Sequence, residues 1–197
     1  VCLAQNYARE GSKWMKPYFR VGWNLMKYNL IRVLFCRNLK IQGLPLLGYN
    51  TKISVYKTSS VTLGKNIISD GRCVIIADQD ARVEIGDRVY FNEGMMISAK
   101  KSVVIGAGCQ FGPNVKIFDN NHCFDKGQGV LAKHSSSGIS IGKNCWVAAN
   151  VTILKGTSIG DNCVIGAGCV VKGDIPSASI VTQQNNLKIA QIEDRKL

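Results

Sequence analysis

The sequence lacks several features that define common protein classes. No apolar run reaches the 18 or so residues of a membrane-spanning helix. Histidine occurs only twice, and no two cysteines have the CxxC spacing of a zinc site. A zinc centre with three histidine ligands is therefore disfavoured, and no metal is expected.

Acidic residues are also scarce. The chain has 13 Asp and Glu against 25 Lys and Arg, which gives a formal net charge of +12. Through Lys40 there are eight basic residues and a single acid, Glu10, so more than half of the excess lies in the first fifth of the chain. Such a charge is typical of proteins that meet nucleic acid, an acidic membrane surface or an anionic substrate.

What the sequence does contain is a six-residue repeat. An aliphatic side chain returns at every sixth position of one stretch: Ile141, Val147, Ile153, Ile159, Ile165 and Val171. This period is neither the 3.6 of a helix nor the 2 of a flat strand. Three residues after each of the first five stands Asn or Gly, the residues that adopt positive φ most easily. The pattern predicts a short strand and one left-handed corner per hexad, with three hexads in each triangular coil.

A small residue follows each of these corners, and four of the eight cysteines occupy that position: Cys109, Cys145, Cys163 and Cys169. We interpret them as small buried apolar groups and not as disulfide partners. Free thiols indicate a reducing compartment. The first residues show no apolar core of a signal peptide, so the predicted location is cytoplasmic.

The chain divides into three parts. Residues 1–40 have aromatic and aliphatic residues near helical spacing, separated by basic ones, and predict a helical segment with Pro17 at its start. Two roles fit this segment: a cap on the first coil, or an amphipathic arm at a membrane surface. No nucleic-acid recognition module is visible. Residues 41–182 carry the repeat, and residues 183–197 form a C-terminal tail.

The repeat is interrupted by one long excursion. After Ile117 the next in-phase residue is Ile141, so residues 119–138 are predicted to be a protruding loop, polar and rich in Gly and Ser. Both histidines lie in it. His122 directly follows a strand that can hold it, whereas His134 lies further along, in the flexible part. A neutral imidazole can act as a general base toward a hydroxyl, so His122 is the candidate for chemistry; a solvated loop histidine is the alternative.

The in-phase hexads resemble those of the hexapeptide-repeat acyltransferases over roughly residues 41–182. The resemblance implies an all-β solenoid, a left-handed parallel β-helix, assembled as a homotrimer with acetyl-CoA in the groove between subunits. His122 precedes Trp146 by 24 residues, which resembles the spacing from the catalytic histidine to a tryptophan in the family's sugar O-acetyltransferases. The resemblance therefore implies that His122 is the general base.

The same resemblance assigns residues to the cofactor. Ala149 and Ala167, 18 residues apart, match positions whose backbone amides meet acetyl-CoA in the family. Lys172 and Gly173 match the next contact, and the lysine can also attract a CoA phosphate. The alternative for the two alanines is that they are ordinary repeat positions.

Other positions are assigned to the acceptor. Asn92, in YFNEG, is similar to the asparagine that holds the acceptor in maltose and galactoside acetyltransferases, and Trp146 is a candidate pocket residue. Asp119 is a candidate for contact with the substrate, and either Asp119 or Asn120 is a candidate for orienting the imidazole. Two departures separate this chain from that subgroup: Lys100 replaces an expected Asp, and TQQNNL at 182–187 replaces the family's usual tail.

The predicted activity is transfer of an acetyl group from acetyl-CoA to a hydroxyl of a saccharide, such as capsule or O-antigen. An N-acetyltransferase acting on an amino-sugar and a non-catalytic scaffold remain as alternatives. A γ-type carbonic anhydrase shares the solenoid but needs three histidines. An acyl-cysteine route through Cys123 is disfavoured, because adjacent strand residues point to opposite faces. The expected partners are the acceptor, the other subunits and, through residues 1–40, the membrane surface.

Overall fold

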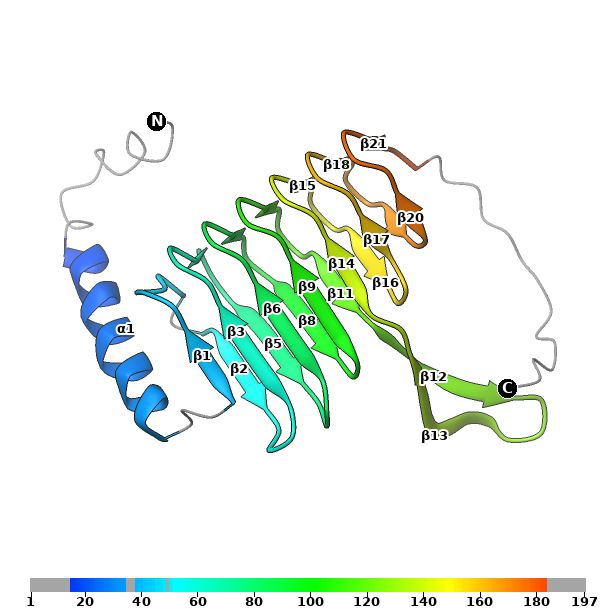
Figure 1. Ribbon diagram of the computed structural model, residues 1–197, viewed down its shortest axis with the longest axis horizontal. Coiled ribbons are helices and arrows are strands. Elements are labelled where there is room, and N and C mark those ends of the chain that lie inside the picture. The colour runs from blue at the N-terminus through cyan, green and yellow to red at the C-terminus, as the bar shows by residue number, and fades with distance from the viewer. Residues whose placement is uncertain (1–14, 35–37, 49, 184–197) are drawn as a thin grey trace.

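The hexads form a parallel β-solenoid with one helix at its N-terminal end (Figure 1). This computed structural model describes residues 15–34, 38–48 and 50–183. Three parallel sheets form the sides of the solenoid, and each coil contributes about one strand to each of them. The predicted all-β solenoid is thus confirmed. Residues 1–14 of the N-terminal segment and 184–197 of the tail lie outside the described residues.

The strands alternate among the three sheets along the chain. Sheet A contains β1 (Leu39–Ile41), β3 (Ser60–Leu63), β6 (Arg82–Ile85), β9 (Ser102–Ile105), β14 (Ile139–Ile141), β17 (Ser158–Ile159) and β20 (Asp174–Ile175). Sheet B contains β4 (Ile68–Ser69), β7 (Tyr90–Phe91), β10 (Gln110–Phe111), β15 (Trp146–Val147), β18 (Val164–Ile165) and β21 (Ile180–Val181). Sheet C contains β2 (Lys52–Val55), β5 (Cys73–Ala77), β8 (Met95–Ala99), β11 (Lys116–Phe118), β16 (Thr152–Leu154) and β19 (Val170–Val171).

The early coils are longer than the late ones. In sheet A, Leu39 pairs with Val61, Val61 with Val83 and Val83 with Val103, so these coils contain 22, 22 and 20 residues. Later coils return to 18, as in the pairing of Ile141 with Ile159. The extra residues lie at the ends of the sheet C strands and in the corner that leads to sheet A. The sequence repeat before residue 85 looks irregular for this reason.

The predicted left-handed corners are present. Asn144, Asn150, Asn162, Gly156 and Gly168 all have positive φ, between 54° and 76°. Positive φ also occurs at Asp80, Arg88 and Ala178, where no Asn or Gly marks the corner in the sequence. The corners are therefore a property of the coil geometry, which imposes left-handed backbone even on residues that adopt it at a cost.

Substitution at one corner tests this requirement. Asn66 is exposed and has a φ of 56°. Asn66→Val should lower the free energy of unfolding by about 1 to 2 kcal/mol, because a β-branched residue tolerates the left-handed region poorly. Asn66→Gly, the matched control, should stay much closer to wild type in urea unfolding. Equal losses in both variants would show that the corner conformation is not responsible.

The core is a column of inward side chains from all three sheets. The six aliphatic positions of the repeat are all at most 3% exposed. Phe91 and Phe111 stack in neighbouring coils with ring centroids 5.3 Å apart. The small inward cysteines are buried free thiols, and burial raises the pKa of Cys109 to about 12. Cys2 and Cys36 lie outside the described residues. The interpretation of the four inward cysteines as core residues is confirmed.

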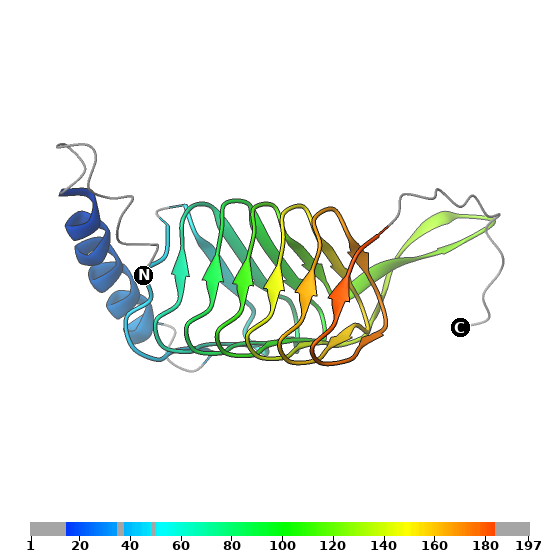
Figure 2. The same ribbon diagram turned by 90° about the horizontal axis from the view of Figure 1, so that it is seen from above.

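Helix α1 (Met15–Leu34) lies across the N-terminal end of the solenoid (Figures 1 and 2). Pro17 falls in its first turn, where a missing N–H breaks no helical bond. The buried Asn24 donates to Leu47 O at 3.1 Å and accepts the Leu47 N–H at 3.2 Å. The helix is therefore fixed to the first coil by polar contacts. Within the described chain, no helix has the length and apolarity needed to cross a bilayer.

Candidate active site

The predicted loop is an ordered β-hairpin. Strands β12 (Asn120–Asp125) and β13 (Gly129–Ser136) pair antiparallel and project from the solenoid beyond its last coils (Figures 1 and 2). Its base is fastened on both sides: the Ser137 N–H donates to Asp119 O at 2.8 Å, and Lys155 Nζ from the next coil donates to Ser135 Oγ. The rigid coil therefore determines where the residues at the hairpin base lie.

The hairpin brings the two histidines together. His122 and His134 are directly paired across the strands, and their ring centroids are 4.1 Å apart with 44° between the ring planes. The expectation that His134 lies in a flexible part of the loop is wrong. Antiparallel pairing places it on the same face as His122 and as close to the solenoid.

Two further charged groups lie near the histidines, and sequence reasoning missed one of them. Lys100 Nζ forms an ion pair with the Asp78 carboxylate, one coil earlier at the same corner. The hydrogen bond from Lys100 and that from the Gln79 N–H hold the pKa of Asp78 below its usual value. Desolvation, with the nearby charges of Lys100 and His122, lowers the pKa of His134. These effects favour the neutral form of His134.

Because the chain has only two histidines, NMR titration can check this environment. In Lys100→Gln the pKa of His134 should rise, because a positive charge is removed and the Asp78 carboxylate loses its partner. The wild-type protein should show one histidine titrating below the ordinary value. A titration of His134 that does not change in the variant would contradict the described cluster.

Asp119 is a structural residue of this corner. It is fully buried, and its two carboxylate oxygens accept the N–H groups of Lys100 and Lys101, each at 2.7 Å. These bonds fix the corner from which the hairpin starts, and they leave Asp119 without access to a substrate. Cys123 is buried and His122 exposed, which agrees with the expectation that adjacent strand residues face opposite ways.

A second group of candidate residues lies at the corner between sheets B and C. Ala149 and Ala167 are stacked there in successive coils, and the Gly168 N–H donates to Ala149 O at 2.9 Å. Within the described residues, the N–H groups of Ala149 and Ala167 have no acceptor. Earlier coils differ at this position: the Arg72 N–H donates to Glu93 Oε1 and the Glu93 N–H to Asn92 Oδ1. Among the described residues, this corner thus holds two stacked N–H donors that are free.

The remaining predicted residues divide between two corners. Asn92 lies at the same corner as the two alanines, three coils before Ala167, and its side-chain oxygen is bonded to its own turn. Lys172 and Gly173 follow β19, at the corner that carries the hairpin. Trp146 is 55% exposed on the outer face of sheet B, in register with Val164 and, one coil further, Ile180.

Sheet C separates the histidines from the free amides. Ala149 precedes β16, whereas His122 follows the neighbouring strand β11, which runs parallel to it. Four or five extended residues span about 15 Å, so one chain does not bring an amide donor to the imidazole. Within one chain, the two groups of candidate residues therefore lie at opposite edges of the same sheet.

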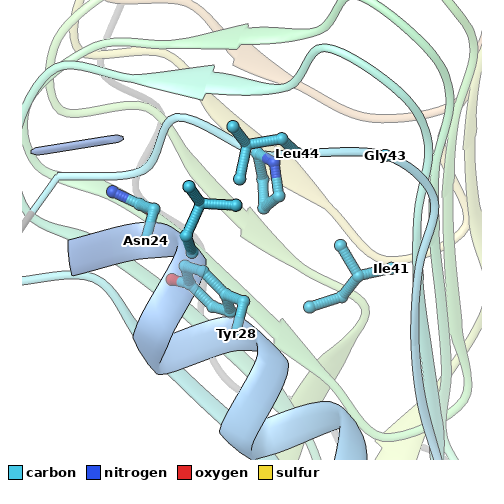
Figure 3. A pocket seen from close by; sticks show the side chains of 7 residues that line it. Asn24, Tyr28, Ile41, Gly43 and Leu44 are labelled. Atoms are coloured by element: carbon cyan, nitrogen blue, oxygen red, sulfur yellow. The ribbon is translucent and has the colours of Figure 1, made fainter. Parts of the chain in front are cut away.

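Two other features do not contribute to this site. A cavity of about 230 Å³ lies between α1 and the first coil, where Asn24 and Tyr28 face Ile41 and Leu44 (Figure 3). It is at the end of the solenoid far from the hairpin (Figure 1). Across the described ranges, no three His, Cys, Asp or Glu side chains are grouped as metal ligands would be.

Comparison with known proteins identifies the repeat. Residues 138–173 match the family model described as bacterial transferase hexapeptide (six repeats). The chain is 29% identical over 179 residues to the putative lipopolysaccharide biosynthesis O-acetyl transferase WbbJ of Escherichia coli, covering 86% of this chain and 88% of that protein. It is 30% identical over 142 residues to the galactoside O-acetyltransferase of Escherichia coli, covering 72% and 69%.

A solved structure shares the fold at low sequence identity. The N-acyltransferase AntD of Bacillus cereus, in complex with dTDP-4-amino-4,6-dideoxyglucose and coenzyme A, superposes with a TM-score of 0.62 at 13% identity, over 78% of this chain and 82% of that one. The fold match, the family model and the galactoside O-acetyltransferase agree on one conclusion. The chain belongs to the hexapeptide-repeat acyltransferases, the left-handed β-helix family that includes these acetyltransferases.

Proposed function

We propose that this protein transfers an acetyl group from acetyl-CoA to a hydroxyl of a saccharide. The main support for this proposal is the pair of free backbone N–H groups at Ala149 and Ala167. Backbone donors stacked one coil apart can hold an extended chain with amide carbonyls, such as the pantetheine arm of CoA. Lys172 is exposed next to Gly173 at the hairpin corner, two coils after β11 and on the same side of sheet C as His122. For CoA bound between subunits it supplies a positive charge toward a phosphate.

His122 is the proposed general base. Its imidazole accepts the proton of the acceptor hydroxyl as the oxygen attacks the thioester carbonyl carbon. Backbone N–H groups stabilise the oxyanion, the carbon–sulfur bond then breaks, and the imidazolium returns its proton to the leaving thiolate. The neighbouring His134 is in ring contact and restricts the orientation of His122, and its lowered pKa favours the form without positive charge.

The separation of the two groups of candidate residues supports a homotrimer in which adjacent subunits share each active site. His122 of one subunit would then lie across the groove from Ala149 and Ala167 of its neighbour. On sheet B the exposed Trp146 and Ile180, with the half-buried Val164 between them, supply apolar surface for such an interface. In this arrangement Trp146 lines the groove, and Asn92 lies on the amide side of it.

The acceptor is proposed from the relatives. The two Escherichia coli proteins are named as O-acetyltransferases, one for lipopolysaccharide biosynthesis and one for galactosides. AntD is an N-acyltransferase whose structure contains an amino-sugar nucleotide. N-acetylation of an amino-sugar is therefore the second candidate function. The six free thiols among the described cysteines and the use of acetyl-CoA fit a reducing cytoplasm.

An acceptor screen separates these candidates. The protein is incubated with acetyl-CoA and a panel of neutral sugars, amino-sugars and nucleotide sugars, and products are detected by the mass of one added acetyl group. Treatment with hydroxylamine then distinguishes the products, because it removes an O-acetyl ester and leaves an N-acetyl amide. A hydroxylamine-sensitive product supports the proposal, and a resistant one replaces it with amine acetylation. Failure of acetyl-CoA to bind in a calorimetric titration would favour a non-catalytic scaffold.

A further inference from the structure

The outward face of α1 is apolar. Four large side chains are exposed there: Phe19 (65%), Trp23 (44%), Met26 (60%) and Leu30 (59%). Their spacing of i, i+4, i+7 and i+11 places them in one line along a helix of 3.6 residues per turn. We call this line the apolar stripe. Apolar surface of this extent on a helix indicates a partner.

The opposite face of the helix contacts the first coil. Arg20 donates to the carbonyl oxygens of Leu46 and Ser69, and the buried Asn24 is bonded to Leu47 in both directions. The inward face therefore combines these polar contacts with the buried ring of Tyr28, whereas the large side chains of the stripe face solvent. Attachment of α1 to the first coil does not use the stripe, which stays available for another surface.

The sequence that includes α1 and the first coil is strongly basic. Residues 1–69 contain eleven Lys and Arg and one acid, Glu10, which is a net charge of +10 out of the total of +12. Helix α1 itself contains four basic residues and no acidic one. On the first coil and its corner, Lys40, Lys52 and Lys57 are exposed. The surroundings of the stripe therefore favour an anionic partner.

We propose that the apolar stripe of α1 binds the interface of an anionic lipid bilayer. Aromatic and aliphatic side chains enter the boundary between headgroups and acyl chains, and the surrounding lysines and arginines attract the anionic headgroups. A second copy of this chain is the less favourable occupant, because it would bring two strongly positive ends together. In the trimer proposed above, three stripes at one end of the assembly would bind one surface together.

Vesicle co-sedimentation of the full-length protein tests this surface without any substrate, so its outcome is independent of the proposed activity. The probes are vesicles of phosphatidylcholine alone and of phosphatidylcholine with phosphatidylglycerol. The variant is Trp23→Gln combined with Met26→Gln, two exposed positions where glutamine keeps the helix. Val130→Gln, at a still more exposed apolar site near the hairpin tip, is the matched control. Circular dichroism and light scattering check folding and assembly.

The wild-type protein and Val130→Gln should sediment with anionic vesicles, less with neutral ones, and less as salt is raised. The double variant should partition roughly tenfold or more weakly, because two large apolar side chains no longer enter the bilayer. Absence of wild-type binding at low salt would overturn the proposal. So would a double variant that keeps its vesicle binding but loses its oligomeric state, since the stripe would then be a protein interface.

Discussion

Replacing His122 by alanine should lower the rate of acetyl transfer by about 10²- to 10⁴-fold, the usual contribution of a general base. Acetyl-CoA binding should stay close to wild type, because the imidazole acts on the acceptor and the free amides of Ala149 and Ala167 are on the other edge of sheet C. The rate is measured with the best acceptor from the screen, and the affinity by calorimetry. The exposed position of His122 makes the folded structure insensitive to the change.

Two control variants distinguish a general base from a covalent nucleophile and from a residue that orients the base. Cys123→Ser should retain the rate, because Cys123 is buried on the opposite face of the strand and forms no acyl intermediate. His134→Ala should lower the rate less than His122→Ala, as expected for an orienting residue. Loss of transfer in Cys123→Ser with full activity in His122→Ala would replace the base mechanism with covalent catalysis.

Ala167→Asp should weaken acetyl-CoA binding by about ten- to a hundredfold. The design copies another corner of the same solenoid, where Asp161 stands in the equivalent position and accepts the Lys143 N–H at 2.7 Å. An aspartate at 167 would accept the Ala149 N–H in the same way, and it would place negative charge beside a polyanionic ligand. Because Ala167 is exposed, the fold accommodates the larger side chain.

A matched variant controls for the added charge. Ser177→Asp introduces a carboxylate at the equivalent position of the corner between sheets A and B, where Ser177 Oγ already accepts the Asp161 N–H at 3.0 Å. Calorimetric titration should give wild-type acetyl-CoA affinity for this variant. Unchanged affinity in Ala167→Asp would mean that the free amides do not bind the donor, and the proposed cofactor site would be wrong.

The period of six and the Asn and Gly corners were sufficient to predict the solenoid, because each hexad obeys the same steric rules. The longer early coils were less visible, since their extra residues have no fixed composition. Positive φ at Arg88 and Ala178 had no sequence signal at all. There the neighbouring coils impose the backbone conformation, so only the assembled structure reveals it.

The candidate site was predicted in part. The position of His122 after a strand followed from the phase of the repeat, whereas its contact with His134 depended on recognising a hairpin. The signal was present in DKGQG, where the Asp125 side chain accepts the N–H groups of Gly127 and Gln128 to form the turn. The pairing of Asp78 with Lys100 was missed because the two residues are 22 apart. A regular coil of three hexads has 18 residues, so the repeat alone does not place them side by side.

In the proposed trimer, each active site combines His122 of one subunit with the free amides of another. A mixed-subunit experiment tests this arrangement. Trimers of His122→Ala and trimers of Ala167→Asp, each inactive at a low concentration of acetyl-CoA, are unfolded together and refolded. Random assembly should restore roughly a quarter of the wild-type activity, because about one interface in four then joins an intact histidine to intact amides. No recovery of activity, in a sample where mass spectrometry shows mixed trimers, would contradict the shared site.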